Sequence, residues 1–127
     1  MYSEIAEILK SRTKQLALNV ILMLDNIPFN TISNVMVNQL TKSITSVGAN
    51  YRSALRAKSK ADFISKLSVV IEEADETLYW LELLHETNRI NKTEFENLHK
   101  ETLEILSIMS KTKISTQKNI ENNKISI

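Results

Sequence analysis

The sequence predicts an all-α protein, folded as an antiparallel up-down-up-down four-helix bundle. The chain of 127 residues contains one glycine and one proline, whereas sheet-containing folds need many turns built from these residues. Apolar residues recur at spacings of three and four along four segments, which is the period of an amphipathic helix. Only short stretches separate these segments, and short connections make consecutive helices antiparallel.

The first helix is expected over Ser3–Asp25. One apolar face consists of Ile5, Leu9, Leu16, Val20 and Leu24. Further apolar residues lie on its other faces, a pattern typical of a helix that is central or covered by a partner. In a domain of this size, a partner chain is the favoured explanation.

The second helix is expected over Thr31–Ala57, after a loop that contains Pro28. Gly48 lies inside this helix and costs about 1 kcal/mol of helix stability relative to alanine at an exposed site. We expect Gly48 to mark a close approach to a neighbouring helix, since it has no side chain to hold the backbones apart.

Capping residues place the last two helices. Ser59 with Asp62 three residues later indicates the start of a helix over Lys60–Thr87. Asn91 with Glu94 repeats this signature and predicts a helix over Lys92–Lys111. Residues 115–127 are polar and continue no apolar face, so a flexible tail is expected there. The bundle domain is therefore predicted over residues 1–114.

Several classes of function find no support in the sequence. Cysteine is absent, which excludes disulfides and thiolate metal sites. No secretory signal opens the chain, and the apolar run Leu16–Leu24 is too short to span a bilayer. No histidine-anchored nucleophile or glycine-rich phosphate loop is recognisable. We expect a cytoplasmic protein that is not an enzyme and has no cofactor, membrane contact or small-molecule substrate.

Charge is unevenly distributed although the net charge is +1. Residues 26–61 carry five basic residues and no acidic residue. These are the candidate nucleic-acid contacts: Lys42, Arg52, Arg56, Lys58 and Lys60. Arg52 and Arg56 share a helix face, because they lie four residues apart. The alternatives are ion pairs with the acidic face of the following helix, or plain solvation.

Residues 62–86 carry seven acidic residues and one basic residue. The run of Glu72, Glu73, Asp75 and Glu76 can bind a divalent cation or an arginine-rich partner, but is more often a solvated face or an interface. Counting outward from the turn, Lys42 alone lies level with this run within one chain. Arg52 and Arg56 can instead meet the acidic face of a neighbouring copy, a heterologous contact that can close into a ring.

Three aromatic residues, Tyr51, Tyr79 and Trp80, can stack on bases, but packing is the favoured interpretation. Trp80 lies off the apolar seam of its helix, which suggests a subunit interface. The candidate interface residues are Arg52, Arg56, Glu72, Glu73, Asp75, Glu76 and Trp80.

Two Glu-x-x-His patterns occur, Glu82 with His85 and Glu96 with His99. They form half of the di-metal carboxylate pattern of four-helix bundles, whose other half needs a glutamate from each remaining helix. The second helix contains no acidic residue, so the site is short of ligands and no metal is expected.

Three segments resemble one family: GANYR (48–52), RAKSKADF (56–63) and EEADETLYWLELL (72–84). It is the four-helix-bundle family encoded within intervening sequences of bacterial 23S ribosomal RNA genes. Ile44 and Lys42 depart from its usual pattern of a small residue and an arginine. The resemblance implies a four-helix bundle similar to the accessory variability protein of diversity-generating retroelements, a basic ring that binds nucleic acid. It also implies a homopentamer, with no established enzymatic activity.

The sequence therefore favours a non-enzymatic, homo-oligomeric scaffold or accessory factor, pentameric if it follows the family, that contacts RNA or DNA. The alternative is a purely structural or protein-binding oligomer whose arginines are used in the interface. A di-metal carboxylate bundle is a remote third interpretation.

Overall fold

Four helices account for most of the computed structural model, which describes residues 3–125. They are α1 (Glu4–Leu24), α2 (Thr31–Leu55), α3 (Lys60–Glu86) and α4 (Lys92–Ile125). No strand occurs between residues 3 and 125. The prediction of an all-α four-helix bundle is confirmed.

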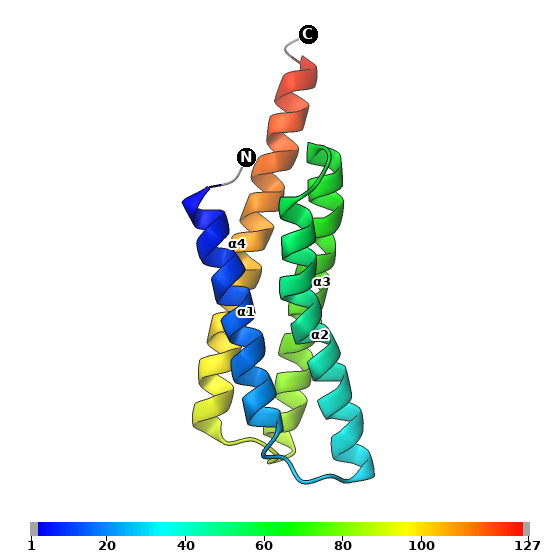
Figure 1. Ribbon diagram of the computed structural model, residues 1–127, viewed down its shortest axis with the longest axis vertical. Helices are drawn as coiled ribbons and strands as arrows, with labels where there is room; N and C mark the ends of the chain where they lie inside the picture. Colours follow the sequence, from blue (N-terminus) through cyan, green and yellow to red (C-terminus); the bar gives the residue numbers. More distant parts are fainter. Residues whose placement is uncertain (1–2, 126–127) are drawn as a thin grey trace.

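The helices pack around a central core, and each one contacts two others. Helix α1 packs against α2 and α4, and α3 packs against the same two helices. Figure 1 shows the chain direction alternating from one helix to the next, with short connections at both ends of the bundle. The outcome is a four-sided bundle in which α1 and α3 lie diagonally opposite.

Side-chain caps begin all four helices, which explains why the predicted starts agree with the structure. Ser3, Asn30, Ser59 and Asn91 each accept a hydrogen bond from the backbone N–H three residues later. Asp62 also accepts from the backbone N–H of Lys58, at 3.1 Å. These contacts satisfy N–H groups that have no partner inside the helix.

The turn between α3 and α4 is closed by a left-handed residue. Asn88 has a φ of 59°, and its N–H donates to His85 O at 3.0 Å. The N–H of Arg89 donates to Leu84 O at 2.8 Å, which completes a Schellman motif. The Arg89 Nε then donates to the buried Ser33 Oγ at 2.7 Å, so this turn is tied to the start of α2.

The buried face of α1 agrees with the predicted one, with a single correction. Ile5 was expected on the buried face of α1 but is 66% exposed, because the buried stripe begins one residue later at Ala6. On α2, Met36 is buried and Val35 beside it is exposed. Neighbouring residues in a helix point about 100° apart, so a one-residue error moves a side chain off the core.

Helix α4 is longer than the sequence indicated. It was expected to end at Lys111 and instead continues to Ile125. No glycine or proline interrupts residues 92–125. The Thr112 and Thr116 hydroxyls donate to carbonyls four residues earlier, at 2.8 Å in both cases. Figure 1 shows this end of α4 projecting beyond the other helices. The expected polar tail is therefore helical to Ile125, and its last two residues lie outside the described part.

Helices α1 and α2 approach closely where Gly48 faces Thr13. A Cβ atom placed on Gly48 would lie 3.4 Å from Thr13 Oγ1 and 3.7 Å from the Thr13 carbonyl carbon. Thr13 is buried, and its hydroxyl donates to Lys10 O at 3.1 Å. The close approach expected of Gly48 is confirmed, although it leaves room for a methyl group.

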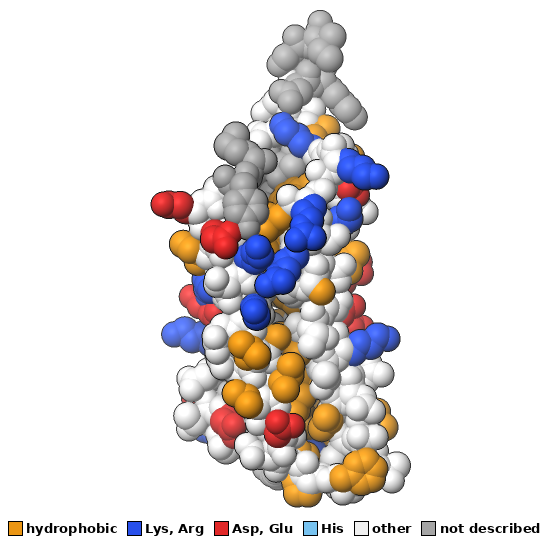
Figure 2. Space-filling view, in the orientation of Figure 1, with side chains coloured by type: hydrophobic (Ala, Val, Ile, Leu, Met, Phe, Trp, Pro, Cys, Tyr) orange, Lys and Arg blue, Asp and Glu red, His pale blue; other side chains and the backbone are white. Residues whose placement is uncertain are grey.

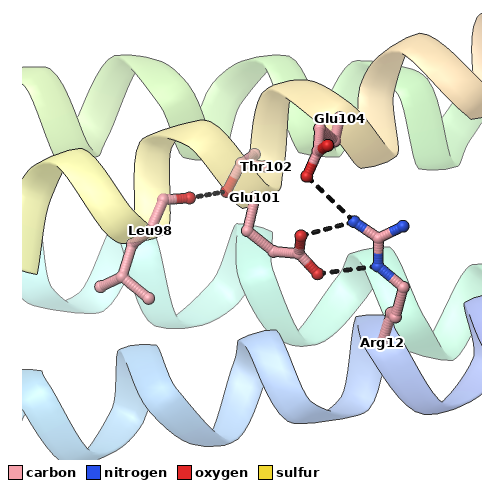
Figure 3. Close-up of polar contacts among 5 residues, drawn as sticks. All are labelled: Arg12, Leu98, Glu101, Thr102 and Glu104. Carbon is pink, nitrogen blue, oxygen red and sulfur yellow. Dashed lines mark hydrogen bonds and ion pairs between the residues drawn. The ribbon is translucent and has the colours of Figure 1, made fainter.

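An arginine joins α1 to α4 (Figure 3). Arg12 Nε donates to Glu101 Oε2 at 2.9 Å, and its Nη2 donates to Glu101 Oε1 in a bidentate contact. The same Nη2 lies 3.3 Å from Glu104 Oε2. The hydrogen bond to Glu101 raises the pKa of the Arg12 guanidinium, so this group stays charged. The planar fork fixes both distance and orientation between the two helices.

None of the helices within residues 3–125 is long and apolar enough to cross a membrane. Large apolar side chains nevertheless remain exposed. On α1 they include Ile8, Leu18 and Leu22, and the loop before α2 adds Phe29, which is 82% exposed. The expectation that α1 is apolar on more than one face is therefore confirmed.

A double-mutant cycle tests the contact between α1 and α4. We expect Arg12→Ala and Glu101→Ala to be coupled by about 0.5–1 kcal/mol in the free energy of unfolding, measured in urea by circular dichroism. The exposed pair Lys92 and Glu96, 3.7 Å apart, is the matched control and should couple more weakly. Equal coupling energies in both pairs would show that the bidentate geometry of the Arg12–Glu101 contact adds nothing to stability.

Gly48→Ala tests the spacing of α1 and α2. We expect it to raise the free energy of unfolding by about 0.5–1 kcal/mol, because a methyl group fits at ordinary contact distance and alanine favours the helix. Ala49→Gly, at the exposed neighbouring position, should lower stability by a similar amount. A loss of stability in Gly48→Ala would mean that the two helices are closer than described.

Candidate functional site

A surface groove of about 510 Å³ runs between α1 and α2. Its lining includes small residues, among them Ala17, Gly48 and Ala49. Because these residues fill little space, the two helices leave a trough between them above the Gly48–Thr13 contact.

Four basic residues line this groove, two from each helix. Lys10 and Lys14 come from α1, and Arg52 and Arg56 come from α2. Each pair is separated by four residues, which places both side chains of a pair on one face of their helix. Figure 2 shows Lys and Arg side chains gathered over the upper half of the face formed by α1 and α2.

The groove has a strongly one-sided charge. Among the described residues, no carboxylate lines it. Arg52 and Arg56 are exposed, and neither forms an ion pair within residues 3–125. Intramolecular pairing of these two arginines with α3, one of the alternatives left open by the sequence, is therefore absent from this part of the chain. Concentrated positive charge beside hydroxyl groups suits an anionic ligand.

The five basic residues predicted as nucleic-acid contacts do not all line the groove. Arg52 and Arg56 lie in the groove, whereas Lys58 and Lys60 line a second cavity of about 390 Å³ between the α2–α3 turn and α4. Lys42 faces α3 instead, where its charge acts on Glu73. That placement agrees with the expectation that Lys42 lies level with the acidic run.

Lys10 and Lys14 were missed as site residues. Residues 1–25 carry three basic and three acidic residues, so a count of charge by segment conceals them. The four-residue spacing of this pair matches that of Arg52 and Arg56, and Gly48 predicted a close contact of α2 with some neighbour. The sequence did not reveal that this neighbour is the basic edge of α1.

The acidic run on α3 is divided between two environments. Glu72, Asp75 and Glu76 are exposed, whereas Glu73 is half-buried on the side toward α2. Burial raises the pKa of the Glu73 carboxyl, and repulsion from Glu76 and Glu72 adds to the rise, while Lys42 opposes it. Glu73 thus interacts with Lys42 inside the chain. The three exposed carboxylates remain available to a partner.

The three aromatic residues considered for base stacking differ in exposure. Tyr51 is 4% exposed and belongs to the core, so the expectation that it packs is confirmed. Trp80 is half-buried against the core, and its ring meets that of the exposed Tyr79 edge-on at 5.0 Å. Trp80 as an interface residue stays a prediction.

One contact, between His99 and Glu82, joins the two Glu-x-x-His patterns. His99 Nε2 lies 2.9 Å from Glu82 Oε2, while His85 stacks on Phe95 with ring centroids 4.2 Å apart. Glu96 lies on the surface, 3.7 Å from Lys92. Within the described residues, no group of three or more His, Asp or Glu side chains is arranged to hold a metal ion.

Glu73→Gln tests the charge arrangement between α2 and α3. The raised pKa means that the folded state binds the Glu73 proton more tightly than the unfolded state, so the carboxylate lowers stability at neutral pH. We expect Glu73→Gln to raise the urea midpoint at pH 7. The gain should disappear as the pH falls below the ordinary range of glutamate, where both states are protonated. Asp75→Asn, at an exposed position, should change the midpoint less, and equal shifts would contradict this account.

Comparisons with known proteins agree with this fold. The family described as 23S rRNA-intervening sequence protein matches residues 7–111. The chain is also similar to a crystal structure from Bacteroides thetaiotaomicron, a protein with unknown function from the S23 ribosomal protein family. The two share 34% identity over 83% of this chain and 97% of that chain, with a TM-score of 0.76. No curated protein matches. Because the match spans most of the bundle, the chain belongs to the 23S rRNA-intervening sequence protein family.

Proposed function

We propose that this chain is a non-catalytic, homo-oligomeric bundle protein that acts as a scaffold or accessory factor. In this proposal, the groove between α1 and α2 binds the phosphate backbone of a nucleic acid. The observation that carries it is the cluster of Lys10, Lys14, Arg52 and Arg56 around a groove without carboxylates.

Phosphate groups fit the chemistry of this cluster. Guanidinium groups donate two parallel hydrogen bonds to phosphate oxygens, and lysines add point charges. A nucleic acid presents many phosphates in a row, so it can engage all four basic residues at once. The chain as a whole is almost neutral, so binding depends on this local concentration of charge and should be sensitive to salt.

Self-association is supported by apolar surface elsewhere on the molecule. Leu18 and Leu22 are 44% and 64% exposed on α1, and Val69 and Tyr79 are exposed on α3. Figure 2 shows hydrophobic side chains over the lower half of the face that carries the basic groove above. Exposed apolar patches are typical of protein interfaces. We propose a homopentamer, the assembly implied by the family resemblance.

A second candidate function is an oligomer that contacts no nucleic acid. The exposed carboxylates of Glu72 and Glu76 form no ion pair within residues 3–125, so a neighbouring copy can receive Arg52 and Arg56 there. Such a contact joins two different surfaces and can close into a ring. The two candidates compete for the same arginines, so one pair of variants separates them.

The test is the double variant Arg52→Gln/Arg56→Gln, with Lys100→Gln/Lys111→Gln as a control that removes the same charge from exposed positions on α4. The groove proposal predicts that the arginine variant loses about tenfold or more of its affinity for single-stranded RNA at low salt. The slope of log affinity against log salt should become shallower by about 1.4, because two phosphate contacts are lost. Fluorescence anisotropy measures both quantities.

The native mass, from size-exclusion chromatography with light scattering, decides between the two candidates. The groove proposal predicts the same mass for the wild type and the arginine variant. A smaller mass for the arginine variant, with RNA affinity equal to that of the control, would support the protein-only oligomer instead. A monomeric wild type would contradict self-association under either candidate.

A further inference from the structure

The four basic residues of the groove are arranged as a ladder along its length. Gly48 faces Thr13, and the two helices run in opposite directions. Positions along the two antiparallel helices can be counted outward from this contact. Lys14 then lies at the height of about Val47. Lys10 lies at the height of Arg52, to within one residue. Arg56 follows one turn further along α2. The groove therefore has three positive positions in sequence, separated by about 6 Å at 1.5 Å per residue.

From this spacing we infer that the groove holds one unpaired nucleic-acid strand along its axis, and that it contacts three phosphates and no bases. The inference rests on the proposed function and adds the form of the ligand. A stacked strand rises about 3.4 Å per nucleotide, so alternate phosphates would meet successive positions of the ladder. An extended strand would present one phosphate to each position.

The shape of the groove favours a single strand over a duplex. The recess lies between two packed helices, and its lining at Ala17 and Gly48 carries almost no side-chain bulk. A duplex is wide and convex, so it fits a narrow trough between two helices less well than a lone backbone does. Ser53 lines the groove and is half-buried, and its hydroxyl makes no hydrogen bond to another residue within 3–125, so this hydroxyl can donate to a phosphate oxygen.

Within residues 3–125, no aromatic side chain lines the groove, and this composition indicates how a strand would be recognised. Proteins that hold single strands usually stack bases on aromatic side chains. Here Tyr51 is buried in the core, and Tyr79 and Trp80 lie on α3, which is diagonally opposite α1. Without a stacking platform, the groove can read only the sugar–phosphate backbone. Binding should therefore be indifferent to base identity.

The experiment compares three fluorescent probes of equal phosphate number: an oligothymidylate, the same strand made wholly of abasic sites, and a hairpin duplex. We expect the first two to bind within about twofold of each other and the duplex about tenfold more weakly. The salt slope for the oligothymidylate should be about −2 per groove, for three contacts at about 0.7 each. Lys14→Gln should make it shallower by about 0.7, and Lys111→Gln should leave it unchanged.

Each failure has a distinct meaning. If the abasic strand binds about tenfold more weakly than the oligothymidylate, the groove contacts bases and the inference is wrong. If the duplex binds as tightly as the single strand, the groove does not select an unpaired backbone, although the proposed function survives. If none of the three probes binds, the proposed function itself fails.

Discussion

The groove depends on the close approach of α1 and α2 at Gly48. Thr13 lies against α2 there, and a Cβ atom on Gly48 would be in ordinary contact with it, 3.4 Å from its hydroxyl. Helices packed this closely bring the side chains on both rims within reach of one ligand. Lys10 and Lys14 therefore face the same space as Arg52 and Arg56, although about forty residues separate the two pairs. On the other side of α1, the bidentate contact of Arg12 with Glu101 joins the helix to α4 and limits its rotation.

Positive and negative side chains gather on different surfaces of this molecule rather than side by side. The groove carries positive charge, and the outer face of α3 carries Glu72, Asp75 and Glu76. Between them, Lys42 acts on Glu73, whose pKa is nevertheless raised by its burial. Such separation allows an almost neutral chain to attract a polyanion at one surface and a basic partner at another. Exposed apolar residues on α1 and α3 provide area for self-association that need not use the groove.

Most of the fold could be predicted from local signals. Two capping signatures, one proline and a three–four apolar repeat were enough to place three helices to within two residues at each end. The end of α4 could not be placed, because a polar segment without glycine or proline can continue a helix without burying apolar surface. The groove was predicted only in part. Arg52 and Arg56 stood out as charge on one helix face, but Lys10 and Lys14 became visible only when packing brought α1 beside Gly48.

The most direct test of the central claim is to map where a single strand binds. Backbone amide NMR spectra of the ¹⁵N-labelled protein would be recorded during titration with a short oligothymidylate. We expect the largest shift changes between Lys10 and Ala17 on α1 and between Thr45 and Arg56 on α2, with little change on the outer face of α3. Changes concentrated around the cavity beside Lys58 and Lys60, or on α4, would contradict the assignment of the α1–α2 groove as the binding site.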